Sequence, residues 1–522
     1  MIVFHQTVLV IVRMVEMVFV QIAALTFQTA VKHRQSLLKE REMIEKNLKT
    51  RTKREVIAIE NTTNNLIPSR FMHIMDVGSE YKAIYHALNM ETVFVEDKLA
   101  KKISTGSLQN IPVQNLENLK TRGLLIEDET EDTKSYKTVK DKLNSLPLTV
   151  LYLLVTDKCN FDCRYCFIEG GYTKNQSRNQ MSQEIAKRGM DLFVKNIDSG
   201  KKRRRTIIFY GGEPILNWNT VEFALGDIAS RKEKGSLPTN TRVNLITNGS
   251  LITPEIAKVL RKHNVGVSVS LDGRETEHNR NRIFHSSKGT FIETTKGIQI
   301  LKNHNVHVGI SCTLTEGNLE TLEEIATFLV NDLDIVSIGF NFLRENPKFS
   351  LKDPEYMEKA SRAVIESYRI LRKKGVYEDR IMRKVNAFTQ KKPRINNCAG
   401  CGQQIVMAPT GEIGVCHGGI GPKDFFIPYS PDLNTNTHPL WQEWKTRSPF
   451  NMEKCTNCIA LGICGGGCAY EAFLKHDSIW KLDDPFCIHS KMTLEFLVKD
   501  LFEKCLENEK TNRPTLSPSS KH

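Results

Sequence analysis

The first 158 residues of the chain contain no cysteine, although the full 522 residues contain thirteen. A small secreted domain held by disulfides spreads its cysteines through the fold, so this absence argues against such a framework. Most of the thirteen fall in clusters, while Cys312 and Cys505 stand apart, and Cys312 is expected to be a buried core thiol. The distribution indicates iron–sulfur or zinc chemistry in a reducing compartment, which predicts a cytoplasmic location.

A long uninterrupted apolar run is also lacking. Residues 1–30 are apolar but are interrupted by His5, Arg13 and Glu16, whereas a transmembrane helix needs about 18 or more consecutive apolar residues. The segment has neither the basic start nor the small-residue cleavage site of a signal peptide. We expect an accessory helix, or a start codon placed too far upstream, with membrane association through residues 1–30 as the minority alternative.

The chain has no extended block of one charge, although its net charge is +13. The densest basic run is Lys201–Arg205, just before a predicted strand. We interpret it as a solvated loop rather than a nucleic-acid patch, so no nucleic-acid partner is expected. The positive balance would favour an acidic peptide partner.

From residue 148 onward, strand-like and helix-like patterns alternate, which predicts a parallel sheet with right-handed crossovers. Six units are too few for a closed eight-stranded barrel, so the fold class is α/β with a partial (β/α)6 barrel, and a doubly wound sheet is the alternative. The predicted strands are Leu148–Val155, Thr206–Tyr210, Arg242–Thr247, Gly266–Ser270, Val306–Thr313 and Ile335–Phe342. The predicted helices are Ser182–Ile197, Thr220–Arg231, Pro254–Lys262, Phe291–Asn303 and Leu319–Asn331.

Five segments follow from these patterns. Residues 1–65 are an apolar start and a basic helix or linker, 66–145 a small winged-helix-like domain, 146–375 the partial barrel, 376–505 a C-terminal iron–sulfur domain, and 506–522 a disordered tail. Within the small domain we expect strands at Thr92–Glu96 and Leu124–Ile126 and helices at Glu80–Leu88 and Gln114–Lys120, followed by the polar link Glu127–Lys142.

Three cysteines follow the first barrel strand in the run TDKCNFDCRYCF: Cys159, Cys163 and Cys166. Three thiolates on one tight loop can hold three irons of a [4Fe–4S] cluster and leave the fourth open, whereas an electron-transfer cluster is closed by four cysteines. A zinc knuckle or a disulfide loop is the alternative. The loop also carries Tyr165 and Phe167.

Polar and glycine residues follow the next strands, at the edge where parallel sheets bind ligands. Paired glycines allow a close backbone approach, a carboxylate can accept from an ammonium group, and an arginine suits bidentate carboxylate binding. The predicted cofactor-binding residues are Gly211, Gly212, Glu213, Asn248, Ser270, Asp272 and Arg282, together with Tyr165 and Phe167.

Eight more clustered cysteines lie in the C-terminal third of the chain. Eight thiolates can close two four-cysteine cages, and two zinc ribbons are the alternative because Cys-x2-Cys pairs are common zinc ligands. The residues are Cys398, Cys401, Cys416, Cys455, Cys458, Cys464, Cys468 and Cys487.

The cysteine triplet, followed in order by Gly211-Gly212-Glu213-Pro214, Asn248, Ser270 and Arg282, resembles the radical S-adenosylmethionine (SAM) superfamily. The resemblance implies a partial barrel in which SAM binds the open iron of the triplet's cluster. One-electron reduction then cleaves SAM to methionine and a 5′-deoxyadenosyl radical. An electron donor such as ferredoxin or flavodoxin is implied.

The series from Cys398 to Cys487 resembles the SPASM domains of peptide-modifying radical SAM enzymes, which implies two auxiliary [4Fe–4S] clusters and three clusters in all. By resemblance, Cys398, Cys401, Cys416 and Cys468 hold the first auxiliary cluster, and Cys455, Cys458, Cys464 and Cys487 hold the second. A first cluster with three protein ligands and one open iron is the alternative.

Two kinds of peptide chemistry share this resemblance. Maturases of ribosomally made peptides form thioether or carbon–carbon crosslinks and often carry a winged-helix-like domain before the barrel. Anaerobic sulfatase-maturating enzymes typically carry Asp where this chain has His417, so we favour a maturase acting on a peptide or protein substrate. An iron–sulfur electron-transfer protein without catalysis is the alternative of another class, although an open iron site would not serve it.

Overall fold

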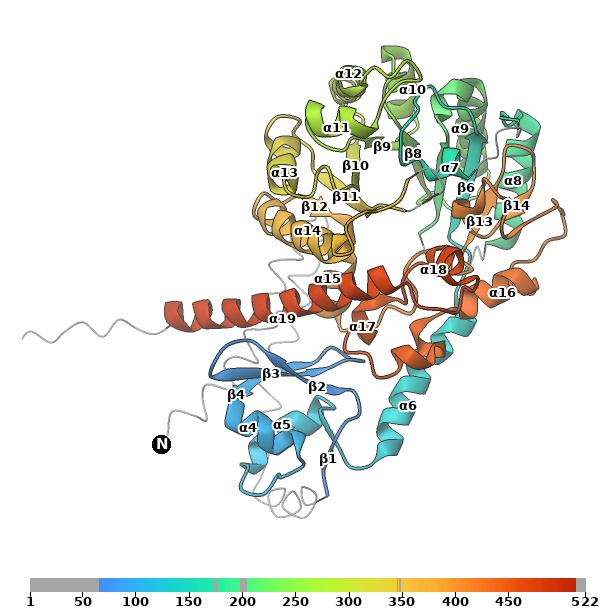
Figure 1. The fold of residues 1–522 in the computed structure, drawn as a ribbon. Coiled ribbons are helices and arrows are strands. Elements are labelled where there is room, and N and C mark those ends of the chain that lie inside the picture. The colour runs from blue at the N-terminus through green and yellow to red at the C-terminus, as the bar shows by residue number, and fades with distance from the viewer. Residues whose placement is uncertain (1–64, 172–176, 198–203, 345, 347–348, 513–522) are drawn as a thin grey trace, which may run out of the picture.

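The computed structural model describes residues 65–171, 177–197, 204–344, 346 and 349–512 (Figure 1). The predictions for residues 1–64 and 513–522 lie outside these ranges. The described part contains no helix that is both long enough and apolar enough to span a membrane.

A ten-stranded sheet forms the centre of the chain, and its six middle strands run parallel in chain order. The order has free ends at β12 and β15, so the sheet is an open barrel, as predicted. All six predicted strands are present, with ends that differ by at most two residues: β6 Val150–Thr156, β7 Thr206–Gly211, β8 Arg242–Thr247, β9 Gly266–Ser270, β10 Val308–Leu314 and β11 Ser337–Phe342.

Four shorter strands extend this sheet beyond the predicted six. β12 pairs parallel with β11, and β13 pairs parallel with β6, which carries the C-terminal third back to the first barrel strand. β14 and β15 continue antiparallel from β13. Their bounds are β12 Tyr377–Glu378, β13 Gln404–Met407, β14 Ile413–Gly414 and β15 Phe426–Ile427.

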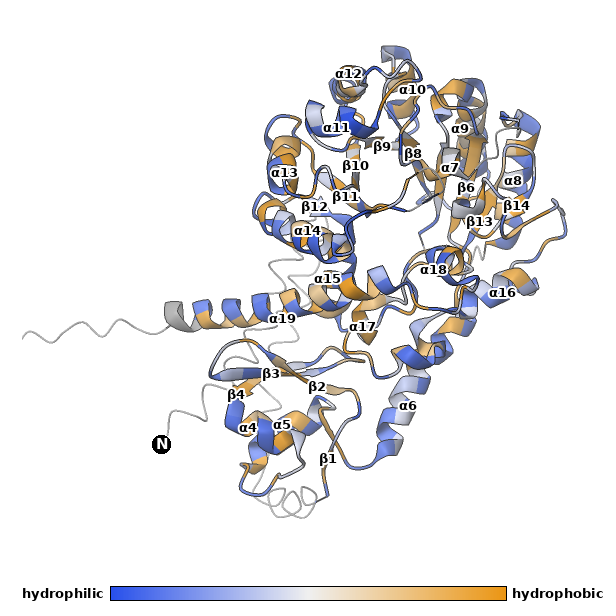
Figure 2. Cartoon of the chain, viewed as in Figure 1, coloured by the Kyte–Doolittle hydropathy of each residue, from blue (hydrophilic) through white to orange (hydrophobic). Residues whose placement is uncertain are grey.

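Helices cover the outer face of the barrel sheet and turn their apolar sides toward it (Figures 1 and 2). Two of them begin at hydroxyl caps: Ser182 Oγ accepts from the amide of Ile185 at 3.2 Å, and Thr253 Oγ1 from that of Ile256 at 3.3 Å. The five predicted helices are confirmed, and α7, α11 and α14 were not predicted. The bounds are α7 Phe167–Gly170, α8 Gln183–Asn196, α9 Trp218–Glu233, α10 Pro254–Lys262, α11 Glu275–Asn281, α12 Phe291–Asn303, α13 Leu322–Asn331 and α14 Tyr356–Lys373.

The N-terminal unit, residues 65–145, contains the three-stranded antiparallel sheet β2-β3-β4 and the two-stranded pair β1-β5. The helix predicted at Glu80–Leu88 is wrong, because Tyr81–His86 is the central strand β3. Its last four residues are all buried, so the period-2 alternation of a half-exposed strand is missing. The bounds are β1 Ile67–Pro68, β2 Met72–Asp76, β3 Tyr81–His86, β4 Thr92–Glu96, α4 Asp97–Ser104, α5 Val113–Thr121 and β5 Leu125–Ile126.

The polar link predicted at Glu127–Lys142 is mostly helical, because α6 spans Glu129–Lys140. Asp128 caps α6, accepting from the amide of Thr130 at 2.7 Å. At the other end of the chain, α19 is helical through Asn512, so residues 506–512 belong to a helix rather than to the predicted disordered tail. The C-terminal helices are α15 Asp379–Gln390, α16 Pro439–Thr446, α17 Leu461–Cys464, α18 Ala469–His476 and α19 Asp484–Asn512.

The N-terminal unit packs against the C-terminal third rather than standing apart. α19 lies between the barrel and the N-terminal sheet (Figure 1), with Phe502 packed on Phe94 at a ring-centroid distance of 5.0 Å. The amide of Gly462 donates to the carbonyl of Ala87 at 2.8 Å. The small unit therefore borders the Cys455–Cys464 loop.

Candidate active site and metal centres

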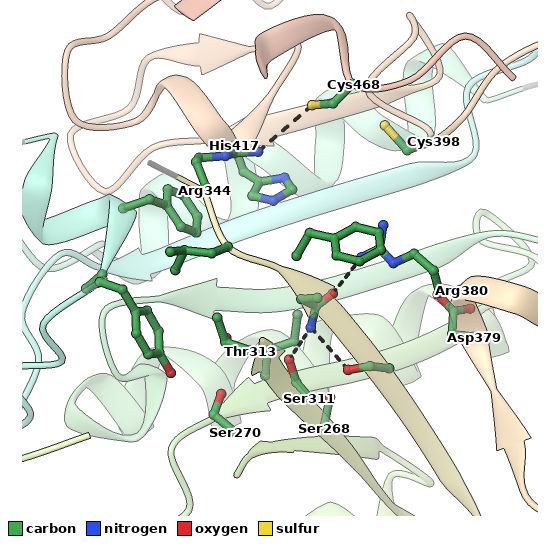
Figure 3. A pocket seen from close by; sticks show the side chains of 18 of the residues that line it. Ser268, Ser270, Ser311, Thr313, Arg344, Asp379, Arg380, Cys398, His417 and Cys468 are labelled. Atoms are coloured by element: carbon green, nitrogen blue, oxygen red, sulfur yellow. Dashed lines mark hydrogen bonds between the residues drawn. The ribbon is translucent and has the colours of Figure 1, made fainter. Parts of the chain in front are cut away.

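The open barrel encloses a cavity of about 1220 Å³ whose wall extends from the starts to the ends of the central strands. Its lining includes all three cysteines of the triplet, together with Cys398 and Cys468 from the C-terminal third. Figure 3 shows Cys398, Cys468, Arg344 and His417 at one side of this space and the barrel serines at another. The cysteine triplet and two of the C-terminal cysteines therefore meet at one cavity.

The cysteine loop is held against the end of β7 by two glycines. A Cβ on Gly211 would lie 2.1 Å from the carbonyl oxygen of Thr156, and one on Gly212 would lie 2.2 Å from that of Lys158. In this close contact the amide of Gly212 donates to Thr156 O at 2.8 Å. In the structure the close approach of these glycines is to the end of β6 and the start of the cysteine loop, and the predicted approach to a ligand stays a prediction.

The three thiols lie in a buried pocket with hydrogen-bond donors beside them. Burial raises the pKa of Cys159 and raises that of Cys163 to about 12. The amide of Phe161 donates to Cys159 Sγ at 3.4 Å, and Arg282 Nη1 lies 3.9 Å from Cys163 Sγ. A bound metal deprotonates a coordinating thiol outright, and N–H donors support cluster sulfurs, so the loop fits an iron–sulfur cluster.

Arg282 lines the cavity and is fixed by a buried carboxylate. Its Nε donates to Asp272 Oδ2 at 2.9 Å, and the Tyr165 hydroxyl donates to the same oxygen. The other oxygen, Oδ1, accepts from the amide of Thr313 at 2.9 Å. Asp272 is only 1% exposed and positions Arg282 and Tyr165, while its own contact with SAM stays a prediction.

Glu213 is a second buried carboxylate next to the cavity. Its side chain is fully buried and accepts from Thr247 Oγ1 at 2.7 Å, the amide of Asn248 at 2.7 Å and the amide of Ile215 at 3.0 Å. Burial raises the pKa of this carboxyl to about 7. Through these partners Glu213 holds the end of β8 beside the cysteine loop, and its contact with SAM stays a prediction.

The remaining predicted contacts line the cavity. Asn248 Nδ2 donates to Asn160 Oδ1 at 2.9 Å and lies 4.0 Å from Cys159 Sγ. Ser270 lies at the end of β9 with its side chain toward the cavity (Figure 3). Cys312, predicted to be a core thiol, is fully buried in β10. The predicted residues in the cavity wall are Tyr165, Phe167, Gly211, Gly212, Asn248, Ser270 and Arg282.

Four C-terminal thiols, Cys398, Cys401, Cys416 and Cys468, form one neighbourhood, which we call the inner thiol set. A hydrogen bond from Cys401 lowers the pKa of Cys398 and raises that of Cys401. Cys398 and Cys416 both interact electrostatically with Cys468, whose pKa burial raises to about 12. The set therefore gathers residues that are up to seventy positions apart in the chain.

The other four thiols, Cys455, Cys458, Cys464 and Cys487, form the outer thiol set. Burial raises the pKa of Cys455 to about 11, and the neighbouring Cys464 and Cys458 add to the shift. Cys487 interacts with all three. This division into two sets is the one that the SPASM resemblance predicts. In the described ranges, no three His, Cys, Asp or Glu side chains converge closely enough to hold a single metal ion.

Arg344 and His417 lie between the cysteine loop and the inner thiol set. Arg344 Nη2 is 4.0 Å from Cys468 Sγ, and its guanidinium stacks over the Phe167 ring at 4.8 Å while pairing with Glu471. Arg344 Nη1 and His417 Nδ1 are buried without a hydrogen-bond partner among the described residues. A guanidinium with an unpaired N–H close to the Cys468 thiol fits a group with acceptor sulfurs.

Sequence reasoning missed Arg344, although the signal was available. The residue follows the last barrel strand by two positions, and the strand-end rule that found Asn248 and Arg282 applies equally there. In the sequence, His417 stood out only because anaerobic sulfatase-maturating enzymes typically carry Asp at this position. Its ring stacks on Tyr152 at 4.6 Å, and burial lowers the pKa of the imidazole to about 3, so it is neutral.

Comparison with known proteins agrees with this arrangement. The pattern described as the radical SAM superfamily matches residues 153–329. Radical SAM cyclopropyl synthase TigE of Paramaledivibacter caminithermalis is 26% identical over 418 residues, covering 74% of this chain and 84% of TigE. The antilisterial bacteriocin subtilosin biosynthesis protein AlbA of Bacillus subtilis is 26% identical over 340 residues, covering 62% of this chain and 67% of AlbA.

A solved structure shares the fold. Native anSMEcpe with bound AdoMet and Cp18Cys peptide superimposes with a TM-score of 0.58 and 21% identity, covering 69% of this chain and 99% of that one. The triplet loop, the open parallel barrel and these relatives agree: the chain belongs to the radical SAM superfamily and is a radical SAM enzyme.

Proposed function

We propose that the enzyme modifies a peptide or protein by hydrogen-atom abstraction, as a maturase that crosslinks a ribosomally made peptide through a thioether or carbon–carbon bond. The observation that carries this proposal is the single cavity lined by both the Cys159/Cys163/Cys166 loop and the inner thiols Cys398 and Cys468. A substrate in this cavity lies between the two thiol groups. The names of TigE and AlbA support a biosynthetic modification of this kind.

In this proposal Cys159, Cys163 and Cys166 would hold a [4Fe–4S] cluster, which would supply the electron for the reductive cleavage of SAM. Arg282 and Asn248 present guanidinium and amide groups to the same cavity. These groups complement the carboxylate and the ribose hydroxyls of SAM. Ser270 adds a hydroxyl, and Tyr165 and Phe167 lie beside the loop where the adenine is expected.

The inner and outer thiol sets each hold one auxiliary [4Fe–4S] cluster, giving three clusters in all. When bound, these clusters supply electron acceptors close to the substrate, and a ferredoxin or flavodoxin serves as the external donor. Arg344, beside the Cys468 thiol, would donate to an inner cluster held there. The wall of the open barrel shields the reacting atoms from bulk water.

The N-terminal unit offers a site for the leader of the peptide. β2 is an edge strand of the β2-β3-β4 sheet and is partly exposed along its length. An extended peptide can add to such an edge through main-chain hydrogen bonds. This supports the expected winged-helix-like, peptide-binding domain at residues 66–145, which remains a prediction.

Formylglycine generation, as in anaerobic sulfatase maturation, is the alternative. It would favour a carboxylate base where this chain has His417. The neutral, stacked imidazole of His417 is a different group in a different setting. We therefore rank crosslinking first.

The test is anaerobic reconstitution followed by metal analysis and incubation with SAM and dithionite. We expect about 12 iron and about 12 sulfide per chain, as three [4Fe–4S] clusters, and formation of 5′-deoxyadenosine. Replacing the Cys159, Cys163 and Cys166 triplet with Ala should remove about four iron and abolish SAM cleavage. Stoichiometric zinc with about four iron would identify the C-terminal thiols as zinc ribbons, and a wild-type enzyme that yields no 5′-deoxyadenosine would indicate an electron carrier.

A further inference from the structure

The inner and outer thiol sets are joined by a short stretch of chain, which we call the glycine bridge. Cys464 belongs to the outer set and Cys468 to the inner set, and only Gly465, Gly466 and Gly467 lie between them. All three glycines have positive φ angles, at 80°, 87° and 70°, a conformation that is unfavourable for residues with a side chain. The turn therefore connects the two sets with a backbone path that other residues could not easily follow.

Arg447 binds the carbonyl groups of the glycine bridge. Its Nη1 donates to the carbonyl oxygens of Gly466 and Gly467, the second at 3.1 Å. Its Nε donates to Ile479 O at 2.8 Å, and its Nη2 donates to Lys481 O at 3.2 Å. The side chain is 0% exposed, and all of these acceptors are neutral main-chain groups.

The charge of Arg447 is not neutralised by a direct ion pair. Asp483 interacts with it electrostatically, but the carboxylate oxygens of Asp483 accept from the amides of Cys468 at 2.8 Å and Phe486 at 3.3 Å. A guanidinium stays charged in proteins, and burial of a charge without an opposite charge is costly. The position of Arg447 therefore suits a cation that lies beside an anionic group.

Both thiol sets are within electrostatic reach of Arg447. It interacts with Cys398 of the inner set and with Cys455 of the outer set. Arg394 also interacts with Cys464 and Cys398, but it is partly exposed, so that solvent screens its charge more. Metal-bound thiols are deprotonated, and a cluster at each set would therefore present negative charge to the same buried guanidinium.

We propose that Arg447 is a counter-cation shared by the two auxiliary clusters: its charge raises the reduction potential of both, and its hydrogen bonds fix the glycine bridge between them. This inference rests on the proposed function, because it requires a cluster at each thiol set. Reduction adds one negative charge to a cluster, so a buried cation close to it stabilises the reduced form. Arg447 would thus be a positioning residue that sets two potentials together, whereas Arg344 lies beside the inner set.

The experiment is a redox titration of the reconstituted full-length enzyme, followed by electron paramagnetic resonance. Cys468→Ala and Cys458→Ala assign each auxiliary signal, because each variant lacks one of the two clusters. Arg447→Gln removes the charge and keeps N–H donors for the glycine bridge. We expect both midpoint potentials to fall by about 59 mV or more, which is a tenfold change in the ratio of reduced to oxidised cluster for a one-electron couple. Arg447→Lys keeps the charge and should hold that ratio within about threefold of the wild type.

Arg372→Gln is the matched control, because Arg372 pairs with Asp500 and none of its electrostatic partners is a thiol; both ratios should stay within about twofold. A fall confined to one cluster, unchanged potentials in Arg447→Gln, or equal falls in Arg447→Gln and Arg447→Lys would overturn the inference. Equal falls would mean that the hydrogen bonds, and not the charge, set the potentials.

If Arg447→Gln does not load both auxiliary clusters, Arg447→Lys decides the question. Full iron content with potentials close to those of the wild type supports the shared cation, and lost iron or shifted potentials in this variant would overturn it. Zinc at the C-terminal thiols of the wild type would instead contradict the proposed function. Loaded clusters whose potentials do not respond to Arg447 would contradict this inference alone.

Discussion

The inner and outer thiol sets have similar composition but different surroundings. Cys398 and Cys468 of the inner set line the barrel cavity, and Arg344 reaches Cys468 from the end of β11. The cavity wall, as far as described residues form it, includes none of the outer thiols. The outer set instead borders the N-terminal unit, where Gly462 donates to the carbonyl of Ala87 and Tyr136 donates to that of Phe450.

This difference separates two roles that the sequence pattern treats alike. Thiols at the cavity can place a cluster beside the reacting atoms, where a substrate group can touch it. Thiols behind the N-terminal unit are protected from the cavity and suit electron transfer to the protein exterior. Because the same unit offers the proposed leader site at β2, peptide binding and the outer set share one structural support.

Replacing one cysteine from each set gives the largest expected effect. Cys468→Ala and Cys458→Ala should each remove about four iron and stop peptide product, while some uncoupled SAM cleavage continues. The comparison predicts that a thiol-bearing substrate peptide changes the electron paramagnetic resonance signal of the Cys458 variant, which keeps the inner cluster. The Cys468 variant should show no such change. A peptide-induced change confined to the Cys468 variant would reverse the assignment of the two sets.

Arg282→Ala extends the comparison to the Cys159/Cys163/Cys166 loop, whose thiols also line the cavity. Loss of a hydrogen bond to the SAM carboxylate should weaken SAM binding by roughly 1.5–3 kcal/mol, measured by equilibrium dialysis with labelled SAM. Arg274→Ala is the matched control because Arg274 forms ion pairs at the surface with Glu277 and Glu324. Equal affinities for Arg282→Ala and the wild type would remove Arg282 from the SAM site.

A positively charged side chain near one thiol set should shift the reduction potential of that set's cluster and leave the other cluster's potential unchanged. Arg344→Met removes a positive charge beside the inner set and should lower the inner cluster's reduction potential by roughly 40–60 mV, equivalent to about one hydrogen bond in a one-electron couple. Lys384 is buried near Cys464 of the outer set, so Lys384→Met should lower only the outer potential. Redox titration at pH 6 is suitable, because burial lowers the pKa of Lys384 to about 7 and the ammonium remains charged there. If both variants shift the same cluster, the sets are not electrostatically separate.

The regular parts of the chain could be predicted because their signal is periodic. The six barrel strands and five of their helices follow from apolar spacing, and the order of polar residues at strand ends follows from the parallel topology. β3 was misread because its buried residues on both faces remove the alternation. The two-residue strand β12 carries too few positions for any period, and β13 has all four residues buried.

Which partner a side chain chooses could not be predicted from spacing. Glu213 and Asp272 stand at the expected positions, yet their carboxylates are used by Asn248 and Arg282. That choice depends on how far each strand end lies from the cysteine loop, which only the assembled sheet determines. The grouping of Cys468 with Cys398 came from resemblance for the same reason, since chain distance alone favours its neighbour Cys464.

The smallest expected effect comes from removing one hydrogen bond between the N-terminal unit and the segment that carries the outer thiol set. The hydroxyl of Tyr136 donates to the carbonyl of Phe450 at 2.9 Å, and its ring stacks on Phe71 at 5.9 Å. Tyr136→Phe keeps the stacking and removes one hydrogen bond, so the local opening free energy of residues 449–464 should fall by about 0.5–1.5 kcal/mol. Hydrogen exchange measures this opening. Tyr81→Phe is the control, because Tyr81 is 38% exposed and packs only its ring on Phe502. If protection of residues 449–464 is unchanged in Tyr136→Phe, the N-terminal unit does not stabilise the outer set, and the contrast between a cavity-facing and a shielded cluster loses its structural basis.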